Sequence, residues 1–137
     1  KGDILTSVAG PVSNMLVAAI AVFLLVLIAI TSSQGRYIVH NLAAGVPADT
    51  GSFLVPMSLI LYVAMYINVL LAVFNLIPIP PLDGSHVLRH FLPYSALRIY
   101  DSLGMIALVA FMLLGRGVLG ILLYPVIGII DAILLRV

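Results

Sequence analysis

Two long stretches without a charged residue set the strongest constraint on how this chain folds. They run from Ile4 to Gly35 and from Thr50 to Leu82, and each exceeds the roughly 20 residues that cross a bilayer core as an α-helix. They predict membrane-spanning helices over Val8–Ile30 and Phe53–Leu76. Only 8% of the residues are charged, against about 25% in soluble domains. This composition excludes soluble, fibrous and disordered proteins.

The apolar sequence after residue 90 predicts two further spans. A third helix long enough to cross the membrane starts near Ser95, and a fourth covers about Val118–Leu135, with a tight turn at Gly115–Gly117 between them. No internal repeat is visible. The expected fold is therefore all-α: a single polytopic transmembrane helical bundle over residues 1–137, with about four spans.

The positive charges indicate how such a bundle is oriented. Four of the six fall on one side and two on the other, which favours both ends of the chain on the cytoplasmic side. A formal net charge of +1 leaves no basic surface for nucleic acid, and the absence of cysteine excludes disulfides. Because the predicted spans are so apolar, the expected partner is the lipid bilayer. The larger group is Lys1, Arg89, Arg98 and Arg136, and the smaller is Arg36 and Arg116.

Three prolines in four positions interrupt the second span. Pro78, Pro80 and Pro81 lack backbone donors and push the preceding residues out of helical geometry, so the helix must unwind near Pro78. Irregular backbone is tolerated at membrane depth only inside protein or beside a water-filled cavity. Asp83 follows directly, and an ionisable residue at such a break is a functional-site candidate. The alternative is that Asp83 caps a helix from Gly84 to about Leu92, and spacing alone leaves both interpretations open.

Asparagines accompany the break. Asn68 and Asn75 are seven residues apart and share one face of the second span, and an amide buried in hydrocarbon needs a hydrogen-bond partner. For Asn68 we favour a bond between helices. Asn75 lies beside the break, so we favour a functional role for it. Asn14, just after Gly10 and Pro11 in the first span, poses the same question.

Two motifs together give the chain a family resemblance. The chain carries Val8-Ala9-Gly10-Pro11-Val12-Ser13-Asn14 and later Asn75-Leu76-Ile77-Pro78-Ile79-Pro80-Pro81-Leu82-Asp83-Gly84. Found in this order, they resemble the site-2 protease family of intramembrane zinc metalloproteases. The resemblance implies that Asp83 is the third zinc ligand and that Asn75 holds the substrate carbonyl or its oxyanion. It also implies that the prolines form the turn that aims Asp83, and that the metal lies toward the cytoplasmic side of the membrane.

The family's His-Glu-x-x-His helix is absent, because the chain contains no Glu. A hydrolytic zinc site needs about three protein ligands and an activated water, and Asp83 supplies only one ligand. We therefore expect the missing motif upstream of Lys1, in a longer polypeptide of which this chain is the C-terminal part. On its own, the chain is expected to bind Zn²⁺ poorly and to cleave nothing.

The expected function is that of the C-terminal part of an intramembrane zinc metalloprotease, which hydrolyses peptide bonds in or near transmembrane segments of a protein or peptide substrate. The Pro-rich segment is expected to offer an extended edge to an unwound substrate. One alternative is a non-catalytic membrane scaffold of the same fold. Another is a transporter fragment, because transporter sites also use broken helices, but no paired broken helix occurs in the other half of the chain.

A histidine pair lies just after Asp83. His86 and His90 are four residues apart on one helical face, and with Asp83 they would give three donors of the kind that bind metal. Arg89 stands directly before the second histidine, and the expected helix lies at the water interface. We favour an interfacial pair without a metal.

The remaining polar and small residues have simpler interpretations. His40 is expected to be structural or solvent-exposed, and Asp131 is expected to pack or to reach the interface. Arg98 and Asp101, three residues apart, share one face of the third span. Small residues in the last span allow close helix contact within or between chains, so the oligomeric state stays open. They are Gly117, Gly120 and Gly128.

Overall fold

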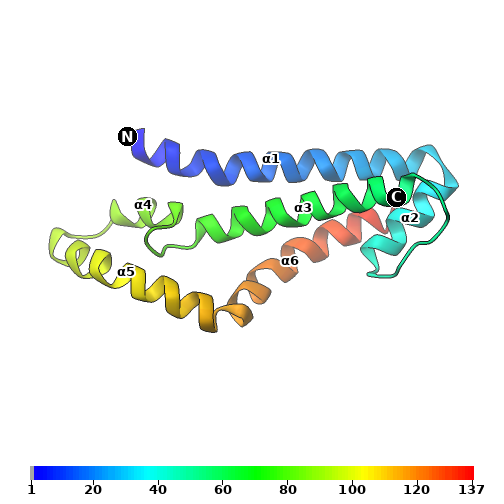
Figure 1. Cartoon of the computed structure of the whole chain (residues 1–137). Coiled ribbons are helices and arrows are strands. Elements are labelled where there is room, and N and C mark those ends of the chain that lie inside the picture. Colours follow the sequence, from blue (N-terminus) through cyan, green and yellow to red (C-terminus); the bar gives the residue numbers. More distant parts are fainter. Residues whose placement is uncertain (1) are drawn as a thin grey trace. The chain divides into compact units, whose positions relative to one another are not determined.

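The computed structural model is all-helical, with 81% of the chain in helices (Figure 1). It describes the backbone of residues 2–137 and the side chains of residues 7–115 and 117–137. Over that described backbone, six helices follow one another along the chain. They are α1 (Gly2–Thr31), α2 (Ser33–Ala43), α3 (Leu54–Leu76), α4 (Asp83–Arg89), α5 (Tyr94–Leu114) and α6 (Arg116–Leu134).

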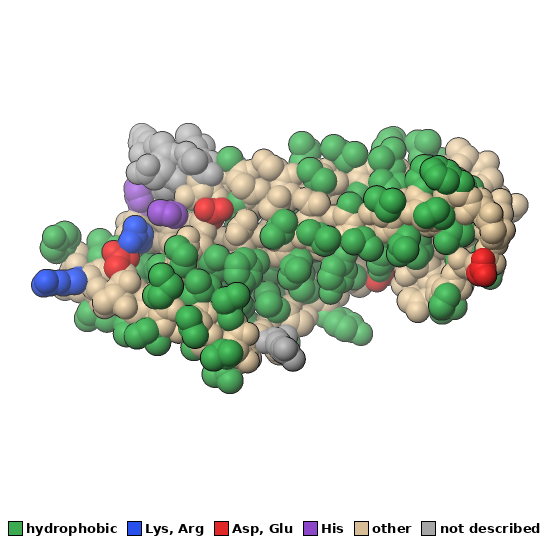
Figure 2. All heavy atoms as spheres, in the orientation of Figure 1, with side chains coloured by type: hydrophobic (Ala, Val, Ile, Leu, Met, Phe, Trp, Pro, Cys, Tyr) green, Lys and Arg blue, Asp and Glu red, His purple; other side chains and the backbone are tan. Residues whose placement is uncertain are grey.

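The predicted spans are confirmed. Of the described helices, four are long and apolar enough to cross a membrane. Their ends lie within a residue or two of the predicted ends, except that α1 begins at Gly2 rather than near Val8. Many of their large apolar side chains point outward, and Figure 2 shows such side chains spread over the visible face. In a bilayer this surface contacts lipid tails, which are as apolar as the side chains themselves. The four spans are Ser7–Thr31, Leu54–Leu76, Tyr94–Leu114 and Gly117–Leu134.

The chain divides into two compact units. The first unit comprises the residues up to Asn14 together with Leu70–Leu123, and the second comprises Met15–Val69 together with Tyr124–Val137. The first unit thus holds the start of α1, the end of α3, all of α4 and α5, and the start of α6. It contains Asn75 and Asp83, together with both sequence motifs.

The second unit is held by an apolar core and one polar contact. Leu25, Ile28 and Ala29 of α1 pack with Val39 of α2 and with Leu134 at the end of α6. The expectation that both chain ends lie on the cytoplasmic side stays a prediction.

The polar contact of the second unit joins α3 to α6. The Tyr62 hydroxyl donates a hydrogen bond of 2.9 Å to Oδ1 of Asp131. Asp131 is half-buried, so it is a packed residue with a specific partner. Sequence analysis did not identify Tyr62 as that partner, because the two residues lie far apart in the chain.

Candidate functional site

α3 ends at Leu76, as the proline pattern predicts, and the Pro-rich turn (Ile77–Leu82) follows it. The turn is closed by its own hydrogen bonds. The amide of Ile77 donates to the Phe74 carbonyl at 3.1 Å, that of Ile79 to Ile77 at 2.9 Å, and that of Leu82 to Ile79 at 2.8 Å. The other residues of the turn are prolines, which have no amide hydrogen. The described turn therefore has no free backbone amide to offer a strand-like substrate, so the expected pairing could use only its carbonyl groups and stays a prediction.

α4 begins at Asp83, one residue earlier than a capping role would require. The residue before the helix is Leu82, with φ −69° and ψ 154°, and no side chain makes a capping hydrogen bond. The interpretation of Asp83 as the N-cap of a helix over Gly84–Leu92 is therefore wrong, because the extended backbone that a cap needs occurs at Leu82. The Asp83 carboxylate is consequently not used in capping.

Gly84 explains how the turn folds back on α3. A Cβ atom at Gly84 would lie 2.8 Å from the carbonyl oxygen of Ile77 and would also collide with the carbonyl of Leu76. Only a residue without a side chain allows the backbone of α4 to approach the end of α3 so closely. Asn75 directly precedes Leu76, and Asp83 directly precedes Gly84, so both candidate site residues border this contact.

The start of α1 meets the same point. A Cβ atom at Gly10 would lie 3.1 Å from Oδ2 of Asp83. The first motif therefore borders the carboxylate that ends the second motif, although the two are far apart in the sequence. Asn14 follows Gly10 by one helical turn and is half-buried.

The polar atoms at this point are not engaged by the protein. Among the residues that the structure describes, neither the Asp83 carboxylate nor the Asn75 amide has a hydrogen bond or an ion pair, and both side chains are half-buried. Asn68 differs, because its Nδ2 donates to the Ala64 carbonyl of its own helix at 2.8 Å. The expected bond from Asn68 to another helix is therefore not formed.

The donors present fit one position of a metal site. Among the described side chains, no three histidines or aspartates come together to hold a metal ion, so the trio of Asp83, His86 and His90 does not assemble. Both histidines are exposed. Structural and catalytic zinc ions take carboxylate oxygen as a ligand but require further protein ligands. The Asp83 carboxylate, unpaired and beside a glycine, is suited to be one such zinc ligand.

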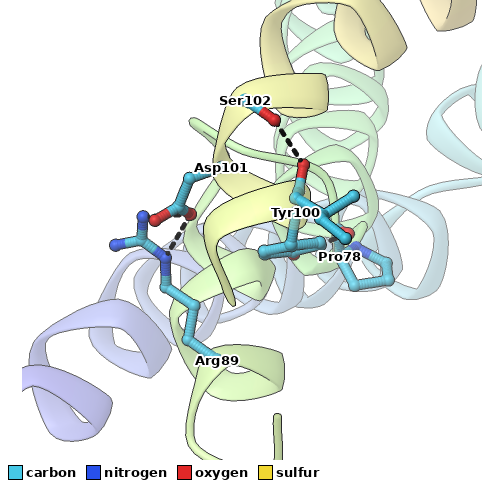
Figure 3. Close-up of polar contacts among 6 residues, drawn as sticks. Pro78, Arg89, Tyr100, Asp101 and Ser102 are labelled. Carbon is cyan, nitrogen blue, oxygen red and sulfur yellow. Dashed lines mark hydrogen bonds and ion pairs between the residues drawn. The ribbon is translucent and has the colours of Figure 1, made fainter. Parts of the chain in front are cut away.

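Three contacts join the Pro-rich turn and α4 to α5, and Figure 3 shows two of them, the Tyr100–Pro78 hydrogen bond and the Arg89–Asp101 ion pair. The Tyr100 hydroxyl donates a hydrogen bond of 2.9 Å to the Pro78 carbonyl, and Gly104 is buried against the ring of Pro80. Arg89 forms an ion pair with Asp101, in which Nε donates at 3.0 Å. Asp101 therefore pairs across elements, although the sequence placed it on one face with Arg98.

Sequence analysis missed Tyr100 and Gly104. Their spacing of four residues puts them on one face of α5, but nothing local indicates which element that face contacts. Figure 2 shows charged and histidine side chains gathered over α4 and the beginning of α5, beside the largely apolar helices.

Comparisons with known proteins place this geometry in context. Residues 1–115 match peptidase family M50, a region that contains both motifs and the Pro-rich turn. The chain is similar to the protein named "Putative zinc metalloprotease YwhC" from Bacillus subtilis, with 36% identity over 90 residues, which are 66% of this chain and 35% of that protein. The chain thus spans about a third of that relative's length. No solved structure matches the chain significantly.

Proposed function

Since this chain belongs to peptidase family M50, we propose that it forms the C-terminal part of the membrane core of an intramembrane zinc metalloprotease. The complete protein hydrolyses peptide bonds in or near the transmembrane segments of its substrates. The proposal depends above all on the approach of Gly10 to the Asp83 carboxylate. This approach brings two motifs of the site-2 proteases to one point in the fold.

Asp83 serves in this proposal as the third zinc ligand. Its carboxylate has no partner among the described residues. Asp83 directly follows the Pro-rich turn, which is closed by internal hydrogen bonds. The other two ligands and the general base come from a His-Glu-x-x-His helix upstream of Lys1, because this chain contains no Glu. When bound, Zn²⁺ supplies a water of lowered pKa and polarises a carbonyl group.

Asn75 binds the substrate in this proposal. Its half-buried amide lies in the last turn of α3 and makes no hydrogen bond within the described part of the chain. A free Nδ2 group can donate to the oxygen of the scissile carbonyl, where negative charge develops during hydrolysis. A donor fixed in advance at that oxygen stabilises the transition state more than the substrate.

A transmembrane protein or peptide is the proposed substrate, and the bilayer is its setting. The four apolar helices and the family make this chain a membrane protein. The apolar outer surfaces of its spans accept a neighbouring helix as readily as they accept lipid. In this proposal the metal lies toward the cytoplasmic side of the membrane, as the family resemblance implies.

A second candidate function is that of a non-catalytic scaffold, because no complete metal site forms among the described side chains. A non-catalytic relative would keep the same scaffold and bind membrane partners without cleaving them. The two functions differ in whether the protein holds zinc.

The experiment is to purify the full-length protein and its Asp83→Asn variant in lipid nanodiscs. Zinc content and cleavage of a transmembrane substrate are then measured for both. The protease proposal expects the variant to lose most of its zinc and all of its cleavage. Asp49→Asn, an exposed carboxylate in the loop before α3, is the matched control and should change neither. Stoichiometric zinc with full activity in Asp83→Asn would refute the ligand assignment, and a wild-type protein without zinc would favour the scaffold.

A further inference from the structure

The Pro-rich turn is held in place by few contacts. An open groove of about 390 Å³ lies between the turn, α4 and α5, with Pro78, Pro80, Leu88 and Leu103 along it. Because side chains leave this space open, packing alone does not fix the turn, and the contacts that do reach it gain importance.

The first such contact is the hydrogen bond from Tyr100 to the Pro78 carbonyl, at 2.9 Å. In a continuous helix, the amide of residue 82 would bond this carbonyl. Here the Leu82 amide bonds Ile79 instead. A carbonyl left unpaired in a membrane is costly, so the tyrosine hydroxyl compensates for the break in the helix and ties the turn to α5.

The second contact is the packing of the Pro80 ring against Gly104 of α5. A Cβ atom at Gly104 would lie 2.5 Å from Cβ and 2.8 Å from Cγ of Pro80, closer than real side chains approach. The glycine therefore makes a notch in α5 that accepts the proline ring. Tyr100 and Gly104 are four residues apart, so the bond and the notch occupy one face of α5.

The third contact is weaker. The ion pair of Arg89 with Asp101 joins the end of α4 to α5, but its two side chains are 38% and 44% exposed. Exposed ion pairs contribute little to stability. Tyr100 and Gly104 are therefore the main contacts that hold the turn on α5.

We propose that Tyr100 and Gly104 are positioning residues that fix the Pro-rich turn on α5 and thereby fix the direction of the Asp83 carboxylate. Only Pro81 and Leu82 separate the ring seated on Gly104 from Asp83. A displacement of the turn therefore reaches the carboxylate directly. The inference rests on the proposed role of Asp83 as a zinc ligand, and neither residue needs to touch the metal or the substrate.

The test uses the full-length protein in lipid nanodiscs, with variants that remove one restraint at a time. Tyr100→Phe deletes the hydroxyl, and Tyr94→Phe is its control, because Tyr94 is 91% exposed. Gly104→Ala fills the notch, and Gly120→Ala is its control, because no atom lies within 4 Å of a Cβ there. Zinc affinity is measured by competition with a chelator, and kcat, KM and thermal stability are measured on the same samples.

We expect Tyr100→Phe to weaken zinc binding about fivefold, the value of one hydrogen bond. kcat should fall while KM stays constant, because the substrate is not contacted. Gly104→Ala should have at least as large an effect, and both controls should stay within about twofold of the wild type. If Tyr100→Phe changes only the folded fraction, and the folded molecules keep wild-type zinc affinity and kcat, the positioning role is refuted. This variant preserves the test if Gly104→Ala fails to fold.

A double-mutant cycle separates this inference from the proposed function. If Tyr100 acts through Asp83, Tyr100→Phe should no longer change zinc affinity when Asp83 is already Asn. An undiminished effect in that background would contradict the inference. If Asp83→Asn weakens zinc binding but Tyr100→Phe does not, the inference alone is wrong. If Asp83→Asn leaves zinc binding intact, the proposed ligand and the inference both fail.

Discussion

Replacing Gly10 by Ala tests the geometry on which the proposed site depends. The added Cβ would lie 3.1 Å from Oδ2 of Asp83, whereas ordinary van der Waals contact begins at 3.4 Å. The carboxylate must therefore withdraw by about 0.3 Å, the difference between these two distances. Zinc–ligand distances in well-formed sites fall within about 0.2 Å of their standard values. The required displacement of the proposed ligand is therefore larger than this spread, and zinc binding should weaken.

The expected size of the effect follows from the indirect nature of the change. Substitutions that disturb a zinc ligand through a neighbouring group weaken metal binding by about 10- to 100-fold. Gly10→Ala adds one methyl group next to a side chain that can partly rotate, so its effect should lie near the lower limit of this range. We therefore expect zinc affinity to fall about tenfold. Helix stability should move in the opposite direction, because Ala stabilises a helix interior by about 1 kcal/mol relative to Gly.

The assay measures zinc affinity and thermal stability of the full-length protein with Gly10→Ala. Weaker zinc binding in a protein that is as stable as the wild type, or more stable, confirms the geometry. Gly117→Ala is the control, because a Cβ at that position meets no atom within 4 Å. Unchanged zinc affinity in Gly10→Ala, together with a loss in Asp83→Asn, would show that the carboxylate does not lie beside Gly10 in the zinc-bound protein.

Three other substitutions have distinct expected results. Asn75→Ala should lower kcat by about 10²- to 10³-fold and leave the zinc content unchanged, as expected for the loss of an oxyanion donor. Asn41→Ala in α2 is the control. Loss of zinc in Asn75→Ala would instead make Asn75 part of the metal site. Gly84→Ala should reduce zinc content more than Gly10→Ala, because its Cβ would lie 2.8 Å from a backbone oxygen that cannot rotate away. A Gly84→Ala protein with full zinc content would rule out the close approach of α4 to α3. Tyr62→Phe should destabilise the protein by about 1 kcal/mol in reversible detergent unfolding, because the Asp131 carboxylate loses its partner. The zinc affinity of the folded protein should not change. An equal loss in an Asp131→Ala background, which has no acceptor at this position, would show that the two side chains are not coupled.

Much of the fold was predictable from local sequence. An uncharged run longer than 20 residues has one favourable structure in a bilayer, so the first two spans followed from length and charge alone. The third and fourth followed from the shorter apolar stretches after residue 90. The end of α3 at Leu76 followed equally directly from the prolines that come after it. Asn75 and Asp83 drew attention because each is a polar residue beside that break.

The errors arose where distant elements meet. The bond of Asn68 to its own helix replaced the expected bond to another helix, and the amides of the Pro-rich turn donate to nearby carbonyls. In each case a nearby backbone group satisfied the polar atom first, because local bonds need no second element to approach. Sequence spacing shows which atoms need partners but not which partner lies closer.

The aspartates show most clearly how the two levels divide. The sequence alone determined that carboxylates in so apolar a chain need a partner or a function, because charge is costly in hydrocarbon. Only the tertiary structure decided which carboxylate has which fate: Asp101 pairs with Arg89, Asp131 accepts a bond from Tyr62, and Asp83 lies unpaired beside Gly10. Helix periodicity is a local property of the chain, whereas these pairings depend on which helices approach within a few ångströms, and packing alone determines that.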